Sequence, residues 1–181
     1  MIRLFVALQL PEPVRNRLAS LCNGIPNVRW VDPNYMHLTL QFIGEVEEPL
    51  LPEVDAVLSG IRCPDFRLAF NGVDFFGDRR RARILWVGTR PSDELIALQS
   101  KIELALARAG LVAESRKFHP HVTLARLKGK KVDRLAAYLG AHAAFITEDF
   151  SVDSFVLYSS RLGRNGAIYT PEANYPLESA F

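Results

Sequence analysis

The tetrapeptide His-x-Thr-Leu occurs twice in this chain, as HLTL at residues 37–40 and as HVTL at residues 121–124. The chain has only four histidines, so two of the four stand in the same frame. Composition alone would produce this coincidence about once in ten thousand chains. The repeat therefore predicts two related structural units, each of which carries one motif.

The elements around the two motifs repeat as well. Phe66 stands 29 residues after His37, and Phe150 stands 29 residues after His121. Apolar runs of strand length alternate with segments of helical periodicity. A unit this long that occurs only twice indicates two α+β lobes facing each other across a shared cleft, and not a repeat array. We predict strands at 2–10, 36–44, 66–76, 83–89, 121–127, 149–159 and about 167–177, and helices at 12–23, 50–61, 92–109 and 132–144.

Strand periodicity decides which motif side chains reach that cleft. Residues two apart on a strand share a face, so His37 and Thr39 point the same way, as do His121 and Thr123. Two imidazoles and two hydroxyls suit cleavage or transfer of a phosphodiester. One histidine can take a proton from the attacking oxygen while the other protonates the departing oxygen, and the hydroxyls can hold the non-bridging oxygens. Hydrolysis by this route needs no metal or nucleotide cofactor.

Other interpretations of the histidines stay open at this point. A lone histidine on a strand is more often structural than catalytic. His37, His119 and His121 could instead bind zinc, although such a site needs ligands from both lobes and an open coordination position. A binding module without turnover is a third alternative, but arginine or lysine would serve phosphate binding more simply than paired histidines.

Composition and charge narrow the class of protein. With 181 residues, of which 49% are hydrophobic and 23% charged, the chain is typical of a globular domain with a sizeable core. The apolar run at 2–10 is too short for a signal sequence or a membrane span. Cys22 and Cys63 lack the spacing of a zinc site, so we expect structural thiols in a reducing cytoplasm. Basic clusters that could contact an RNA backbone, or could simply be solvated loops, stand at 78–83, 114–121, 128–131 and 160–166.

The motif pair and its flanking segments resemble a known family. Paired His-x-Thr motifs about half a chain apart are similar to those of the two-histidine (2H) phosphoesterases, and specifically of the RNA 2′,3′-cyclic phosphodiesterases, also called 2′-5′ RNA ligases. The resemblance covers nearly the whole chain. The similar segments are MIRLFVALQLP, HLTLQFIGEV, LWVG, FHPHVTLAR and LYSSRLGRNGAIYTPEANYPL.

The resemblance implies a fold and an activity. The fold would be α+β, a single domain over 1–181 that is bilobed and duplicated, with two antiparallel sheets and flanking helices around a central cleft. We place the lobes at about 1–77 and 83–165, and the chain can cross between them. The activity would be hydrolysis of 2′,3′-cyclic phosphate ends of RNA or oligoribonucleotides to 2′-phosphomonoesters, by a cytoplasmic monomer that uses no cofactor, metal or membrane. Ligation of RNA or tRNA halves is the alternative.

The resemblance also implies roles within the site. His37 would be the proton donor and His121 the proton acceptor, which spacing alone does not assign. Arg126 is the candidate cation for the phosphate, although simple alternation along its strand places it on the face opposite His121.

Aromatic residues near the motifs are candidates for substrate binding. Phe118 is the one that we assign to the substrate. Tyr35 and Phe76, like Phe118, could stack on a nucleobase, although such aromatic side chains lie more often in the core.

Overall fold

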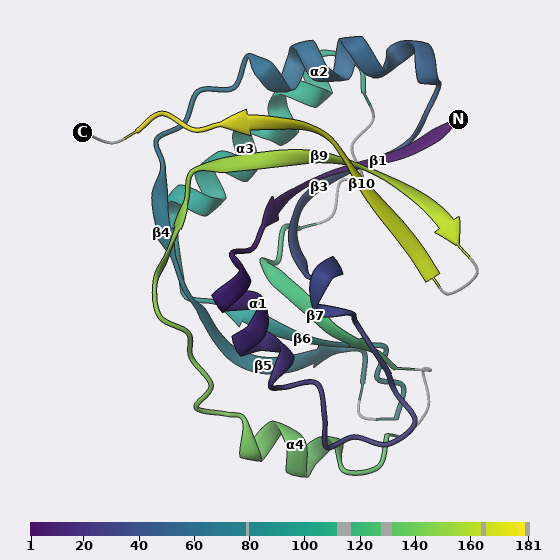
Figure 1. The fold of residues 1–181 in the computed structure, drawn as a ribbon, viewed down its shortest axis with the longest axis vertical. Helices are drawn as coiled ribbons and strands as arrows, with labels where there is room; N and C mark the ends of the chain where they lie inside the picture. Colours follow the sequence, from purple (N-terminus) through teal and green to yellow (C-terminus); the bar gives the residue numbers. More distant parts are fainter. Residues whose placement is uncertain (79, 112–116, 128–131, 164–165, 180–181) are drawn as a thin grey trace.

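A large antiparallel sheet organises the fold (Figure 1). The computed structural model describes residues 1–78, 80–111, 117–127, 132–163 and 166–179. The large sheet runs in the order β10-β9-β1-β3-β7-β6-β5, with β2 paired to β7, and a second sheet holds β4 and β8. The strands are β1 (Ile2–Gln9), β2 (Arg29–Trp30), β3 (His37–Val46), β4 (Phe66–Leu68), β5 (Phe70–Phe76), β6 (Ile84–Thr89), β7 (His121–Arg126), β8 (Phe150–Val152), β9 (Ser154–Gly163) and β10 (Gly166–Pro176). The helices are α1 (Glu12–Ala19), α2 (Leu51–Ser59), α3 (Asp93–Arg108) and α4 (Leu135–Ala141), with short 3-10 turns η1 (Pro33–Tyr35) and η2 (Glu48–Leu50).

The α+β class and the antiparallel sheets are confirmed, but two predicted strands were wrong as single elements. The segment 66–76 divides at Ala69 into β4 and β5, and the segment 149–159 divides at Asp153 into β8 and β9. Leu68, Ala69 and Phe70 are all buried, whereas a strand with one core face buries alternate residues. The chain therefore changes sheets at Ala69. The last helix is also shorter than predicted, because Arg134 has a left-handed backbone (φ 65°) and the helix begins only after it.

The large sheet has two halves that meet between the motif strands. Strands β1, β3, β9 and β10 lie together in the upper half of Figure 1, and β5, β6 and β7 lie in the lower half. The halves join where Leu38 pairs with Val122, and these residues hold the same place in the two motifs. In the small sheet Arg67 pairs with Ser151, and each directly follows one of the two equally spaced phenylalanines. A twofold axis through both pairs would produce this register.

Strands are exchanged between the two halves. β5 follows the first motif along the chain but pairs with β6, next to the second motif. β9 follows the second motif but pairs with β1, next to the first motif. Each half of the sheet is thus built from both parts of the sequence. The lobes at about 1–77 and 83–165 stay a prediction about the sequence repeat.

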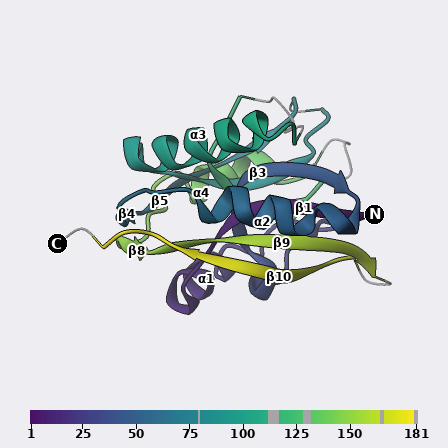
Figure 2. The ribbon, with the colours of Figure 1, turned by 90° about the horizontal axis from the view of Figure 1, so that it is seen from above.

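Helices lie on both sides of the large sheet. In Figure 2, α1 and α3 lie on opposite sides of the strands. The Ser92 hydroxyl accepts from the backbone N–H of Leu95 at 3.1 Å, which caps the start of α3 as its sequence predicts. The Tyr138 hydroxyl of α4 donates to the Leu21 carbonyl at 2.7 Å and ties α4 to the segment after α1. No helix in the part of the chain that the structure describes is long and apolar enough to cross a membrane.

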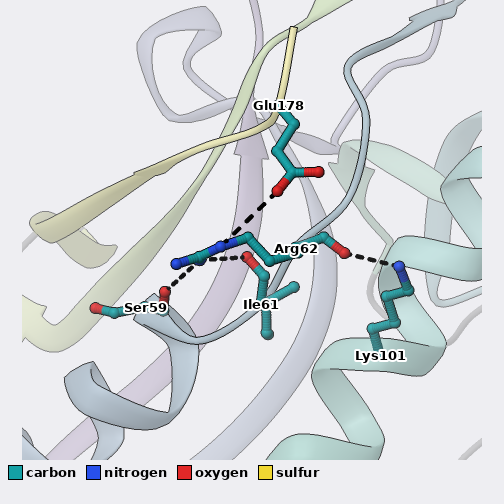
Figure 3. A network of polar contacts seen from close by, with 5 residues as sticks. All are labelled: Ser59, Ile61, Arg62, Lys101 and Glu178. Carbon is teal, nitrogen blue, oxygen red and sulfur yellow. Dashed lines mark hydrogen bonds and ion pairs between the residues drawn. The ribbon is translucent and has the colours of Figure 1, made fainter. Parts of the chain in front are cut away.

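A polar network joins α2, α3 and the C-terminal segment (Figure 3). Lys101 of α3 donates to the Arg62 carbonyl at 2.7 Å, and the Arg62 guanidinium donates to the Ser59 carbonyl at 2.8 Å. The same guanidinium lies 3.8 Å from the Glu178 carboxylate. Both side chains of this ion pair are solvent-exposed, so the pair contributes at most about 1 kcal/mol to the link between Arg62 and Glu178.

Candidate active site

The two motif histidines are held in the same way. His37 and His121 begin β3 and β7. Nδ1 of His37 lies 2.7 Å from the carbonyl oxygen of Tyr35, and Nδ1 of His121 lies 2.6 Å from the carbonyl oxygen of His119. Because a carbonyl can only accept, each Nδ1 carries the hydrogen, and each Nε2 is left for chemistry. The same bond to the residue two positions earlier fixes both rings.

The pairing of β3 with β7 brings the four predicted side chains together. Leu38 and Val122 pair with each other and point into the core, fully buried. In an antiparallel register the next positions place His37 opposite Thr123 and Thr39 opposite His121. All four of these side chains are half-buried, as the predicted alternation requires. The junction therefore places the two motifs side by side on one face of the sheet.

A β-bulge in each motif strand changes which later residue reaches the cleft. Pairing with β6 jumps from Thr123 to Ala125, so Leu124 is an extra residue, and Leu124 and Ala125 are both buried. The alternation is thereby reversed, and Arg126 is exposed on the face of His121. Simple alternation placed Arg126 on the opposite face, and that expectation was wrong because of the bulge.

The first motif has the same bulge. Pairing with β1 jumps from Thr39 to Gln41, and Leu40 and Gln41 are both buried. Phe42 is consequently 50% exposed at the position that corresponds to Arg126. The two halves of the cleft thus present an aromatic ring on one side and a cation on the other.

Both histidines favour the neutral form. Burial lowers the pKa of His37 below its ordinary value; the bond to the Tyr35 carbonyl partly offsets this, and the charges of His121 and Arg126 lower the pKa further. Burial also lowers the pKa of His121; the bond to the His119 carbonyl opposes it, and the charge of His119 adds to it. His121 and Arg126, whose charges act on His37, both lie on β7, the strand that pairs with β3.

Aromatic rings surround each imidazole, and sequence reasoning missed most of them. The His37 ring centroid lies 5.0 Å from that of Phe5, 5.1 Å from that of Tyr169 and 6.2 Å from that of Tyr158. These residues come from β1, β10 and β9, far from the motif in sequence. Alternation within each strand could have shown which residues share a face, but not that these strands lie beside β3.

Around His121 the neighbours are Phe76 at 4.9 Å and Trp86 at 6.0 Å, again between ring centroids. Phe76, one of the predicted stacking residues, therefore lies beside the site. Tyr35 is 39% exposed and meets Tyr169 edge to face. Phe118 is half-buried and packs against the hydrophobic core, so its role in substrate binding stays a prediction.

Zinc and RNA-backbone contacts were the other candidates for this region. Among the described residues, no group of three or more His, Cys, Asp or Glu side chains is placed to hold a metal ion. The His119 ring packs on Trp86 at 4.7 Å and on Phe76 at 5.3 Å. Cys22 and Cys63 are free thiols, as predicted. The basic cluster at 128–131 lies outside the described residues, as do parts of the other three clusters.

Comparison with known proteins gives the same assignment at the level of sequence and fold. The family described as the 2′-5′ RNA ligase superfamily matches residues 11–164. The RNA 2′,3′-cyclic phosphodiesterase of Aeropyrum pernix is 37% identical over 148 residues, which cover 81% of this chain and 84% of that protein. The protein of the same name from Escherichia coli is 32% identical over 179 residues, which cover 97% and 96% of the two chains.

Solved structures agree. Apo LigT of E. coli superposes with a TM-score of 0.77 at 28% identity over 97% of both chains. A protein of Thermus thermophilus superposes with a TM-score of 0.80 at 25% identity, over 99% of this chain and 100% of the other. With its paired motifs, its fold and these matches, the chain belongs to the 2′-5′ RNA ligase superfamily of 2H phosphoesterases.

Proposed function

We propose that the protein hydrolyses the 2′,3′-cyclic phosphate end of RNA to a 2′-phosphomonoester, with His37 as acid and His121 as base. A water molecule attacks phosphorus while Nε2 of His121 takes its proton. The bond between phosphorus and the 3′ oxygen breaks, and Nε2–H of His37 gives its proton to that oxygen. The product carries the phosphate on the 2′ oxygen and has a free 3′ hydroxyl. The two histidines end with their protonation states exchanged.

Three further side chains would stabilise the charge that builds up on the non-bridging oxygens. The hydroxyls of Thr39 and Thr123 can each donate one hydrogen bond, since both lie on the cleft face beside the imidazoles. Arg126 supplies a full positive charge on the same face. Donors that are already oriented before the reaction are the main source of transition-state stabilisation at such sites.

The observation that carries the proposal is the matched pair of imidazoles, each with Nδ1 bonded to a carbonyl and Nε2 left for chemistry. The relatives named RNA 2′,3′-cyclic phosphodiesterase support the substrate. A crystal structure of E. coli LigT complexed with 3′-AMP, at a TM-score of 0.78 and 27% identity, supports a nucleotide in the cleft. A substrate with a 2′ oxygen must be RNA or a ribonucleotide.

We propose in addition that the protein acts as a cytoplasmic monomer, which size-exclusion chromatography and cell fractionation would test.

The decisive experiment is incubation with adenosine 2′,3′-cyclic phosphate in the presence of EDTA. We expect turnover, and phosphorus NMR should identify 2′-AMP as the product. Loss of activity in EDTA that zinc restores would replace the two-histidine mechanism by a metal site. A 3′-AMP product would mean that the other bond to phosphorus breaks. Binding without turnover would leave an inert nucleotide-binding module.

Formation of a 2′-5′ linkage is the second candidate, because the description of the family includes it. In that reaction the 5′ hydroxyl of the second RNA takes the place of water, so His121 again acts as the base and His37 again protonates the departing 3′ oxygen. RNA halves bearing a cyclic phosphate and a 5′ hydroxyl, incubated together at high concentration, would test for the joined product.

A further inference from the structure

A cavity of about 150 Å³ borders His37 on the side of β9 and β10. Three tyrosines line it, and they come from separate elements: Tyr35 from η1, Tyr158 from β9 and Tyr169 from β10. At roughly 30 Å³ per water molecule, the cavity has room for about five waters. That is enough for one flat ring system.

Polar side chains also line the cavity. They are Gln9, Arg15 and Asn34. Within the described residues, the side-chain amides of Gln9 and Asn34 make no hydrogen bond. The Arg15 guanidinium makes neither a hydrogen bond nor an ion pair there. In the same part of the chain, no carboxylate belongs to the lining. The lining therefore combines flat apolar walls with hydrogen-bond donors and acceptors that are available to a ligand, and its charge is positive.

The position of the cavity relative to the reacting phosphorus indicates which part of the RNA could occupy it. Under the proposed function, on which this inference rests, His37 protonates the 3′ oxygen of the terminal ribose. That ribose then lies on the His37 side of the phosphorus, while the attacking water lies on the His121 side. The base of the terminal nucleoside is attached to this ribose, and the preceding nucleoside is joined through its 5′ oxygen. The base of the terminal nucleoside and the base of the preceding nucleoside are therefore both candidates to occupy the cavity.

We propose that this cavity is a nucleobase subsite. Tyrosine rings stack or pack edge-on against any base, since every base has a π-face. The amides of Gln9 and Asn34 can pair with the donor and acceptor edge of the base, and Arg15 can donate to a carbonyl or ring nitrogen acceptor. The site would select RNA over a bare cyclic phosphate ester and would orient the ribose so that its 3′ oxygen faces His37.

The test compares substrates that differ only in their bases. The substrates are adenosine 2′,3′-cyclic phosphate, the same ester on 1-O-methylribose without a base, and a dinucleotide ending in the cyclic phosphate. The variant is Arg15→Gln combined with Asn34→Ala, which leaves the rings around His37 in place. Arg17→Gln is the matched control, because Arg17 lies on the same helix but lines a different hollow with Arg67 and Arg90.

We expect the double variant to raise KM about tenfold or more for a substrate whose base occupies the cavity, while kcat changes less than twofold. KM for the baseless ester should stay unchanged. A rise with the mononucleotide assigns the subsite to the terminal base; a rise with the dinucleotide alone assigns it to the preceding base. The proposal is overturned when KM rises as much for the baseless ester as for the nucleotides. It is also overturned when KM of the double variant equals that of Arg17→Gln on every substrate.

Calorimetric binding of 2′-AMP and of methylribose 2-phosphate gives the same comparison without turnover. Failure of the proposed hydrolysis is thereby distinguishable from failure of the subsite. A protein that hydrolyses nothing but binds 2′-AMP more tightly than methylribose 2-phosphate, with the difference lost in the double variant, retains the base subsite. Equal affinity for 2′-AMP and methylribose 2-phosphate would contradict the proposed base subsite.

Discussion

Replacing Arg126 by Gln should reveal both the phosphate contact and the role of His37. The side chain reaches the cleft only because of the bulge at Leu124. A hydrogen bond from a charged donor contributes about 1.5–3 kcal/mol. At about 1.4 kcal/mol for each factor of ten, this corresponds to roughly a 10- to 150-fold loss in kcat/KM. Because Arg126 is exposed and solvent screens its charge, we expect the lower part of that range, about 10- to 30-fold.

The pH profile gives an independent readout. The charge of Arg126 lowers the pKa of His37, so its removal should raise that pKa. If His37 is the acid, it must be protonated, and activity falls as pH rises through its pKa. The alkaline limb of the kcat/KM profile should then move to higher pH in the variant. A shift of the acid limb to higher pH instead would show that His37 is the base.

The assay is initial-rate hydrolysis of adenosine 2′,3′-cyclic phosphate from about pH 5 to pH 9. Arg161→Gln is the control, because it removes the same charge from an exposed residue whose place on β9 is on the face opposite Tyr158. The reasoning is refuted by a loss below about threefold together with an unchanged profile, or by an equal loss in the control. A drop in melting temperature that accounts for the lost activity would also refute it.

The other expected outcomes concern the four motif residues. His37→Ala and His121→Ala should each lower kcat about a hundredfold or more, and the double variant should lose far less than the product of the two; near-normal turnover in either single variant would point to a mechanism with one histidine. Thr39→Val and Thr123→Val should each cost about 1–3 kcal/mol of transition-state stabilisation at unchanged melting temperature, and a lowered melting temperature would assign the hydroxyls to the fold instead. Because burial lowers the pKa of both histidines, binding of the anionic product 2′-AMP should take up protons near neutral pH and tighten as pH falls. Calorimetry in two buffers of different ionisation enthalpy measures that uptake, and an uptake of zero would contradict the direction of the pKa shifts.

The sequence by itself predicted the four helices, most of the strands and the family, and it singled out the two motifs that the structure places side by side. Alternation along HLTL and HVTL was enough to place His37 and Thr39 on one face of their strand, and His121 and Thr123 on one face of theirs, because side-chain direction in a strand depends on local backbone geometry alone. The equal spacing to Phe66 and Phe150 reflected two strands that pair with each other in the small sheet. Periodicity also found the four α-helices of the described residues, although not every helix end.

Only the tertiary structure decided which strands lie beside each other. The exchange of β5 and β9 between the halves depends on pairing over long stretches of chain, which no local pattern encodes. The same is true of Tyr158 and Tyr169, which meet His37 through the register of β9 and β10. The bulge that turns Arg126 into the cleft arises because β7 has one more residue than its partner strand at that point, and this is a property of the pair of strands.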